Sequence, residues 1–168
     1  PENIKQIYNP VGTERLESQK FEKPKEIQAL KSKYVLLSIG RIELQKDYAL
    51  LIKGMAHLDD NYGLIIVGDG SERPELERLI DEKKLRQKVK LVGRKDDVLP
   101  WLMNATMFIL PSVYEGFPNV VLEAFQCGVP VVTTNFECAK ELVTEDNGMI
   151  CESRSPEALA RCIKIVSE

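Results

Sequence analysis

The sequence predicts an α/β fold, a doubly wound parallel sheet of about six strands with helices on both faces. Two observations carry this prediction: short apolar runs alternate regularly with amphipathic segments, and most of these runs stop at a glycine or proline. Nearly continuous apolar runs are typical of strands buried on both faces, and in parallel sheets such strands are covered by helices on each side.

Each predicted element follows from its own local pattern. In chain order the elements are strand 34–39, helix 47–58, strand 63–67, helix 71–84, strand 89–92, helix 96–103, strand 107–110, helix 119–127, strand 129–133, helix 138–143, strand 149–151 and helix 156–166. The first three strands end at glycines and the fourth at Pro111, and the longer helices carry apolar residues three and four positions apart. Gly128 stands where a C-cap glycine belongs, and Pro156 stands in the first turn of the last helix. This order of elements is Rossmann-like.

Residues 1–33 differ from the rest of the chain. They are polar, contain Pro10 and Pro24, and show weak periodicity. They predict an interdomain linker and lead-in, followed by one folded domain at 34–168.

Composition excludes several classes of function. The net charge is −3 and the basic residues are scattered, which argues against an extended nucleic-acid surface. No apolar stretch approaches the roughly 20 residues of a membrane span. The four cysteines form no C-x-x-C pair and His57 is the only histidine, so no metal site is expected. Unpaired thiols predict a cytoplasmic protein.

The strongest candidate site is the segment from Glu115 to Glu123. It places one carboxylate in the loop after a strand and a second inside the following helix. The helix start offers unpaired amides and a positive dipole end, a combination that suits phosphate or hydroxyl oxygens. An otherwise apolar run surrounds Glu123, which favours a partly buried carboxylate. The alternative is a solvated loop glutamate and an exposed helix glutamate. The residues between the two carboxylates that we expect to contribute are Gly116, Phe117, Pro118, Asn119 and Val120.

Two weaker features follow other strands. Gly40 would let the backbone approach a ligand, and Arg41 with Lys46 could reach a diphosphate. Arg94 follows Gly93 after the third strand, near a bound base or in a plain turn. The Gly-Asp-Gly at 68–70 does not complete a dinucleotide fingerprint, which favours a tight turn.

Taken in order, these residues resemble a known family. Ser38-Ile-Gly-Arg41 with Lys46, Val67-Gly-Asp-Gly70, Pro111-Ser-x-x-Glu-Gly-Phe-Pro-Asn-Val-Val-Leu-Glu-Ala124 and Gly128-Val-Pro-Val-Val132 occur in that order. The pattern resembles the C-terminal, donor-binding domain of GT-B fold retaining glycosyltransferases of group 1, also called GT4. Ile7-Tyr-Asn-Pro10 resembles the linker that precedes that domain.

The resemblance implies roles for individual residues. Arg41 and Lys46 would bind the donor diphosphate, and Glu115 would contact the sugar hydroxyls. Glu123 would bind the ribose, and Gly93-Arg94 would lie near the base. The substrate would be a nucleoside diphosphate sugar, with UDP the expected nucleotide, and no metal or other cofactor is expected.

The resemblance also implies what this chain would lack. The acceptor would be bound by an N-terminal domain that is absent here, so the chain alone is expected to be inactive. The full-length enzyme could still lie at the inner face of the membrane.

Three other functions stay open at this point. One is a sugar-nucleotide epimerase or phosphorylase-type relative on the same fold, and another is a non-catalytic nucleotide-binding module. The third, a dinucleotide-dependent oxidoreductase, is disfavoured because the first strand–helix turn lacks the glycine fingerprint.

Overall fold

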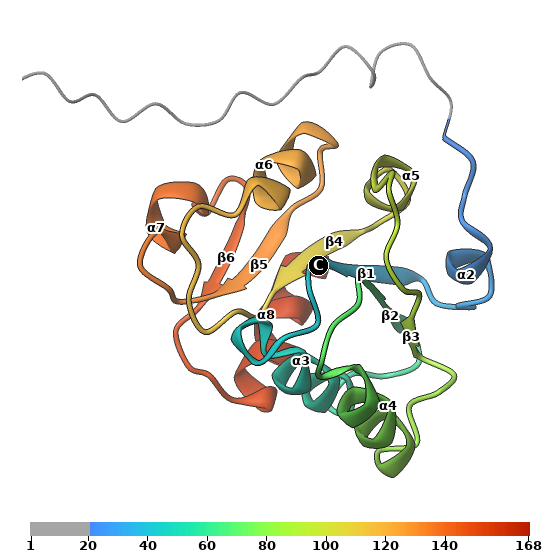
Figure 1. Cartoon of the computed structure of the whole chain (residues 1–168). Helices are drawn as coiled ribbons and strands as arrows, with labels where there is room; N and C mark the ends of the chain where they lie inside the picture. The colour runs from blue at the N-terminus through green and yellow to red at the C-terminus, as the bar shows by residue number, and fades with distance from the viewer. Residues whose placement is uncertain (1–20) are drawn as a thin grey trace, which may run out of the picture.

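The computed structural model describes residues 21–168, and these form one parallel sheet flanked by helices (Figure 1). The strands are β1 (Tyr34–Ile39), β2 (Tyr62–Val67), β3 (Val89–Leu91), β4 (Met107–Leu110), β5 (Val131–Thr134) and β6 (Gly148–Cys151). The helices are α2 (Lys25–Gln28), the 3₁₀ turn η1 (Leu44–Lys46), α3 (Tyr48–Met55), α4 (Arg73–Glu82), α5 (Leu99–Leu102), α6 (Asn119–Gln126), α7 (Ala139–Leu142) and α8 (Pro156–Ser167).

The six strands are ordered β3-β2-β1-β4-β5-β6, and every neighbouring pair is parallel. The chain builds outward from β1 to β3, then returns to the other side of β1 and builds outward again to β6. The order therefore reverses between β1 and β4, and loops that follow these two central strands lie beside each other. In open parallel sheets this reversal is where ligands bind.

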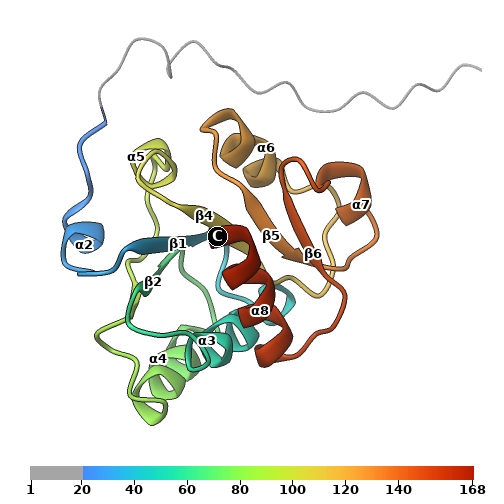
Figure 2. The ribbon, with the colours of Figure 1, turned by 180° about the vertical axis from the view of Figure 1, so that it is seen from behind.

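Successive side chains of each central strand pack alternately into two separate hydrophobic cores. In β1, Leu36 belongs to the core under α3, α4 and α8, whereas Val35 and Leu37 belong to the core under α2, α5, α6 and α7. Figures 1 and 2 show these two helical layers on opposite faces of the sheet. Both faces of the central strands are therefore buried, which explains why their sequences are apolar without interruption.

The predicted fold class is confirmed, and the elements differ from prediction mainly at their ends. The fifth strand was expected from Val129, but β5 begins at Val131. Pro130 has no N–H, and the Val129 amide donates to the Ala124 carbonyl at 2.9 Å, closing the end of α6 instead of joining the sheet. Helix α3 was expected at 47–58 but ends at Met55, because residues 56–58 continue as turns.

The lead-in contains a short helix that packs onto the sheet. In and just after α2, Ile27 and Leu30 are each only 2% exposed and lie in the core with Val35. The predicted linker motif at residues 7–10 lies outside the described residues. The predicted domain boundary at residue 34 stays a prediction.

Candidate functional site

The loops that follow β1 and β4 are joined directly by hydrogen bonds. The Val113 amide donates to the Gln45 carbonyl at 2.8 Å, and the Gln45 side-chain amide donates to the Tyr114 carbonyl at 2.8 Å. These two bonds hold the η1 turn against the loop that precedes α6. The side chains of both loops therefore face one site at the point where the strand order reverses.

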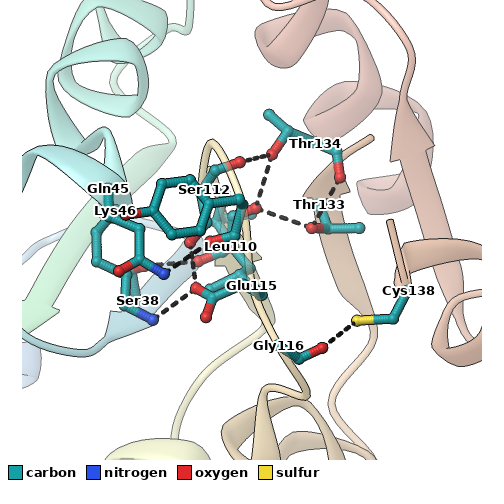
Figure 3. A network of polar contacts seen from close by, with 12 residues as sticks. Ser38, Gln45, Lys46, Leu110, Ser112, Glu115, Gly116, Thr133, Thr134 and Cys138 are labelled. Carbon is teal, nitrogen blue, oxygen red and sulfur yellow. Dashed lines mark hydrogen bonds and ion pairs between the residues drawn. The ribbon is translucent and has the colours of Figure 1, made fainter. Parts of the chain in front are cut away.

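At the centre of this site, Lys46 and Glu115 form an ion pair. The Lys46 Nζ donates to Glu115 Oε1 at 2.6 Å, and the Ser112 hydroxyl donates to the same oxygen at 2.5 Å (Figure 3). The side chains of Lys46 and Glu115 are only 16% and 9% exposed. Two predicted residues that are 69 positions apart thus meet in a partly buried, charge-balanced pair.

Buried threonines fix the start of the loop that carries Glu115. The Thr133 hydroxyl donates to the Leu110 carbonyl at 2.9 Å, and the Thr134 hydroxyl donates to the Ser112 carbonyl at 2.6 Å (Figure 3). The Arg154 guanidinium donates to the same Ser112 carbonyl at 2.7 Å. Sequence reasoning gave no role to these residues, although two threonines at the end of an apolar strand were a visible signal.

Gly40 lies directly over buried side chains of the site. A Cβ at this position would lie 2.9 Å from the Tyr48 hydroxyl oxygen and 3.1 Å from Lys46 Cε. The Tyr48 hydroxyl is buried near Ser38, but it makes no hydrogen bond of normal geometry to any described residue. Burial raises the pKa of Tyr48, so the phenol stays neutral. A glycine is therefore needed here because the turn passes so close to Tyr48.

A pocket of about 520 Å³ opens beside this turn, at the ends of β1 and β2. Its walls are Ile39, Gly40, Arg41, Val67, Gly68, Asp69, Gly70, Arg94, Lys95 and Val98. A Cβ on Gly68 would lie 1.9 Å from the Gly40 carbonyl oxygen, so the 68–70 segment is glycine-rich because two backbones touch. Apolar side chains together with arginine and lysine side chains suit a ligand in which a planar ring is joined to anionic groups.

The loop after Glu115 leads into α6 without a side-chain cap. Pro118 is the N-cap residue, and its carbonyl accepts from the Val121 amide at 3.0 Å. The thiol of Cys138 donates to the Gly116 carbonyl at 2.7 Å and ties the loop to the segment after β5. The helix begins at Asn119, as predicted, so its N-terminus directly follows the loop that carries Glu115.

Glu123 lies one turn further along α6 and is half-buried. Burial raises the pKa of its carboxyl group. Burial and the charge of Glu123 also raise the pKa of the Cys127 thiol, one turn further on. A carboxylate held in a partly apolar setting is a functional-site candidate because its desolvation disfavours folding.

The predicted site residues thus fall into three groups. Lys46, Glu115 and Gly40 come together at the central pair, whereas Arg41 and Arg94 line the pocket beside it. The third group, residues 116–120 with Glu123, forms the start of α6. Arg41 lies on the pocket side of Gly40, and the structure gives it no contact with the Lys46–Glu115 pair among the described residues.

The described residues show neither a cluster of metal ligands nor a membrane-spanning helix. Within 21–168, no three His, Cys, Asp or Glu side chains cluster as metal ligands would. No helix in that range is long and apolar enough to cross a membrane.

The chain is similar to known sugar transferases. It is 33% identical, over its full length, to an N-acetylgalactosamine-N,N'-diacetylbacillosaminyl-diphospho-undecaprenol 4-alpha-N-acetylgalactosaminyltransferase of Campylobacter jejuni, and it covers 45% of that protein. HepE of Anabaena, solved in complex with UDP and glucose, matches with a TM-score of 0.79 and 26% identity over 86% of this chain and 41% of HepE. The lipopolysaccharide outer core galactosyltransferase WaaB matches with a TM-score of 0.73 and 26% identity over 99% of this chain and 45% of WaaB.

The chain therefore spans less than half the length of each of these three relatives. The family described as glycosyl transferases group 1 matches residues 19–168, which is nearly all of the chain. The order of the motifs, the six-stranded sheet and these matches agree with one another. The chain belongs to the group 1 glycosyl transferases and has the fold of the C-terminal half of a GT-B enzyme.

Proposed function

We propose that this chain binds the nucleoside diphosphate sugar from which a full-length enzyme transfers the sugar with retention of configuration. UDP is the proposed nucleotide, since HepE, which shares the fold at 26% identity, was solved with UDP and glucose. The observation that carries the proposal is the Lys46–Glu115 pair at the reversal of strand order. It places a cation for phosphate next to a carboxylate for sugar hydroxyls.

The diphosphate lies, in this proposal, between the central pair and the pocket. Lys46 and Arg41 approach it from opposite sides of the Gly40 turn, and the first amides of α6 face its oxygens or those of the sugar. Glu115 accepts from the sugar hydroxyls. When the bond to the sugar breaks, negative charge grows on the departing diphosphate, and cations already fixed in place stabilise that charge. No metal has a required part in this scheme.

The nucleoside occupies the remaining space. The base enters the 520 Å³ pocket beside Arg94, and the ribose hydroxyls donate to Glu123. Because burial raises the pKa of Glu123, hydroxyl donors would stabilise its carboxylate and recover part of the desolvation free energy.

Thermal unfolding with a panel of ligands tests the proposal. UDP, GDP, ADP, their common sugar conjugates and NAD are compared on the wild-type chain and on Glu123→Ala. A ligand at about 100 times its dissociation constant stabilises by about 2.7 kcal/mol, which raises the midpoint by several degrees in a chain of this size. We expect a UDP-sugar to give the largest shift and Glu123→Ala to lose it. A higher unfolding midpoint with NAD alone, or an unchanged midpoint with every sugar nucleotide, would contradict the proposal.

The same proposal assigns the acceptor to a separate N-terminal domain. The isolated chain should then bind donor and transfer no sugar, which a radiolabelled-donor assay with the candidate acceptors checks directly. The Campylobacter relative is named for a diphospho-undecaprenol acceptor, and we propose that the full-length enzyme likewise takes part in polysaccharide biosynthesis. Sugar transfer by this chain alone would contradict the assignment of donor and acceptor to separate domains.

A further inference from the structure

We propose that Arg154, in the loop between β6 and α8, is a positioning residue that holds Lys46 and Glu115 in the geometry that receives the donor. The inference rests on the proposed function, because it assigns Arg154 a part in the same site. It follows from one guanidinium that bridges the two loops on which the ion pair is built.

The first side of the bridge is an ion pair with Asp47. The Arg154 Nη2 donates to Asp47 Oδ2 at 2.5 Å, and the two side chains are 32% and 29% exposed. The other carboxylate oxygen, Oδ1, accepts from the Leu50 amide at 3.2 Å and caps α3. Both oxygens of Asp47 are therefore engaged, one by the helix and one by Arg154.

Asp47 has an unusual backbone conformation and directly follows Lys46. Its φ of 44° and ψ of 46° lie in the left-handed region, which aspartate enters more readily than most residues but still at a cost in free energy relative to glycine. Such a conformation persists only where surrounding contacts hold it. Backbone bonds of Asp47 to Leu44 and Leu50 contribute to this, and the cap and the Arg154 ion pair are the side-chain contacts that add to them. Arg154 therefore helps to fix the turn that aims Lys46 at Glu115.

The second side of the bridge reaches the loop of Glu115. The Arg154 Nη1 donates to the Ser112 carbonyl at 2.7 Å, and Nη2 lies 3.3 Å from the Pro111 carbonyl. The Ser112 hydroxyl in turn donates to Glu115 at 2.5 Å. One planar group thus connects the backbone before Glu115 with the residue after Lys46, a task that suits the fork of an arginine and not the single ammonium of a lysine.

Loss of Arg154 should affect ligand binding more than it affects the stability of the fold. Partly exposed ion pairs contribute little to folding, so loss of Arg154 should change the unfolding midpoint little. The same loss frees the Lys46 turn and one bond to the Ser112 carbonyl. The effect should therefore be concentrated on ligand groups that contact Lys46 and Glu115.

The experiment compares Arg154→Ala, Arg154→Lys and the control Arg161→Ala, which removes an exposed arginine of α8. Calorimetric titration measures dissociation constants for UDP-glucose and for uridine, which lacks the diphosphate and the second sugar. We expect Arg154→Ala to weaken UDP-glucose about tenfold or more and to leave uridine unchanged. Arg154→Lys should recover little, and Arg161→Ala should match the wild type. Unchanged UDP-glucose binding in Arg154→Ala, or equal losses for both ligands, would overturn the inference.

A second readout does not depend on the donor. Limited acetylation, followed for each lysine by mass spectrometry, reports how firmly Lys46 is held, with exposed Lys53 as internal control. Lys46 should react several-fold faster in Arg154→Ala, and Lys53 should not change. If the wild type binds no UDP-glucose, the proposed function fails, while equal Lys46 rates would separately refute the role of Arg154. Should Arg154→Ala fail to fold, Asp47→Asn keeps the cap, weakens the same bridge and must show the same direction.

Discussion

Close contacts limit which residue can occupy certain positions in this protein, and Gly40 is the clearest case. Its backbone lies against a tyrosine hydroxyl that has no hydrogen-bond partner among residues 21–168, and against the stem of Lys46. The identity of residue 40 therefore affects both packing and the position of the Lys46 amine.

A double-mutant cycle tests this contact. Gly40→Ala should destabilise by about 1–3 kcal/mol, because the added methyl meets the Tyr48 oxygen at 2.9 Å. Tyr48→Phe alone should not destabilise, because it removes a buried hydroxyl without a described partner. In the Tyr48→Phe background the loss from Gly40→Ala should shrink. Urea unfolding of the four proteins measures the coupling, and equal losses in both backgrounds would show that the contact does not determine the penalty.

The half-buried carboxyl of Glu123 predicts a pH-dependent stability. The folded chain raises the pKa of this carboxyl above its usual 4.5. As the pH increases, the carboxyl therefore ionises in the unfolded chain before it ionises in the folded chain. Stability should therefore fall as the pH rises through this window and stay lower above it. Glu123→Gln removes the effect, so its stability relative to the wild type should increase from pH 4 to pH 7.

Denaturant unfolding across that pH range checks the Glu123 prediction. The matched control is Glu145→Gln in an exposed loop. A relative stability of Glu123→Gln that stays constant with pH would contradict the assignment.

At the level of whole elements, local patterns predicted almost every helix and strand. Gly40, Gly68 and Pro111 ended strands as expected. Patterns could not place β5 two residues later, because the bond from Val129 to Ala124 depends on how α6 ends. The core position of Ile27 in α2 could not be predicted either, since a four-residue helix is too short to show a periodicity.

The last helix offers a test of element stability. Ser155 caps α8, with its hydroxyl accepting from the Ala158 amide at 3.2 Å, and α8 buries Leu159 and Ile163 against α3 and the sheet. Ser155→Ala should cost about 1 kcal/mol. Ser153→Ala, at an exposed position of the same loop, is the control for urea unfolding, and an equal loss there would argue against the cap.

Across the whole molecule, the sheet separates two cores that share every central strand. Ile65 belongs to one core and the adjacent Ile66 to the other. Ile65→Val and Ile66→Val should each cost about 0.5–1.5 kcal/mol, and the double variant should show their sum within about 0.5 kcal/mol. A larger coupling in denaturant unfolding would mean that the two layers respond as one packed unit.

The arrangement of the candidate site was predictable mainly where its residues follow a strand in the sequence. Lys46, Glu115 and Arg94 were expected in such loops, and parallel strands bring these loops to one edge of the sheet. Their parts in donor binding stay predictions. The parts proposed for Asp47 and Arg154 could not be predicted, since they rest on a left-handed turn and on a contact across 107 residues. Neither a turn of that kind nor so distant a contact leaves a periodic signal in the sequence.

The pairing of Lys46 with Glu115 also bears on competition among the many phosphates of a living cell. Under the proposed function, inorganic phosphate or a bare nucleotide that took Lys46 would leave the carboxylate of Glu115 without its cation, in a setting where it is 9% exposed. A sugar conjugate brings phosphate for one partner and hydroxyls for the other. We therefore expect ligands that bring phosphate without a sugar to bind weakly, because they leave Glu115 buried without a partner. Abundant free anions should then be poor competitors of the sugar nucleotide for the site.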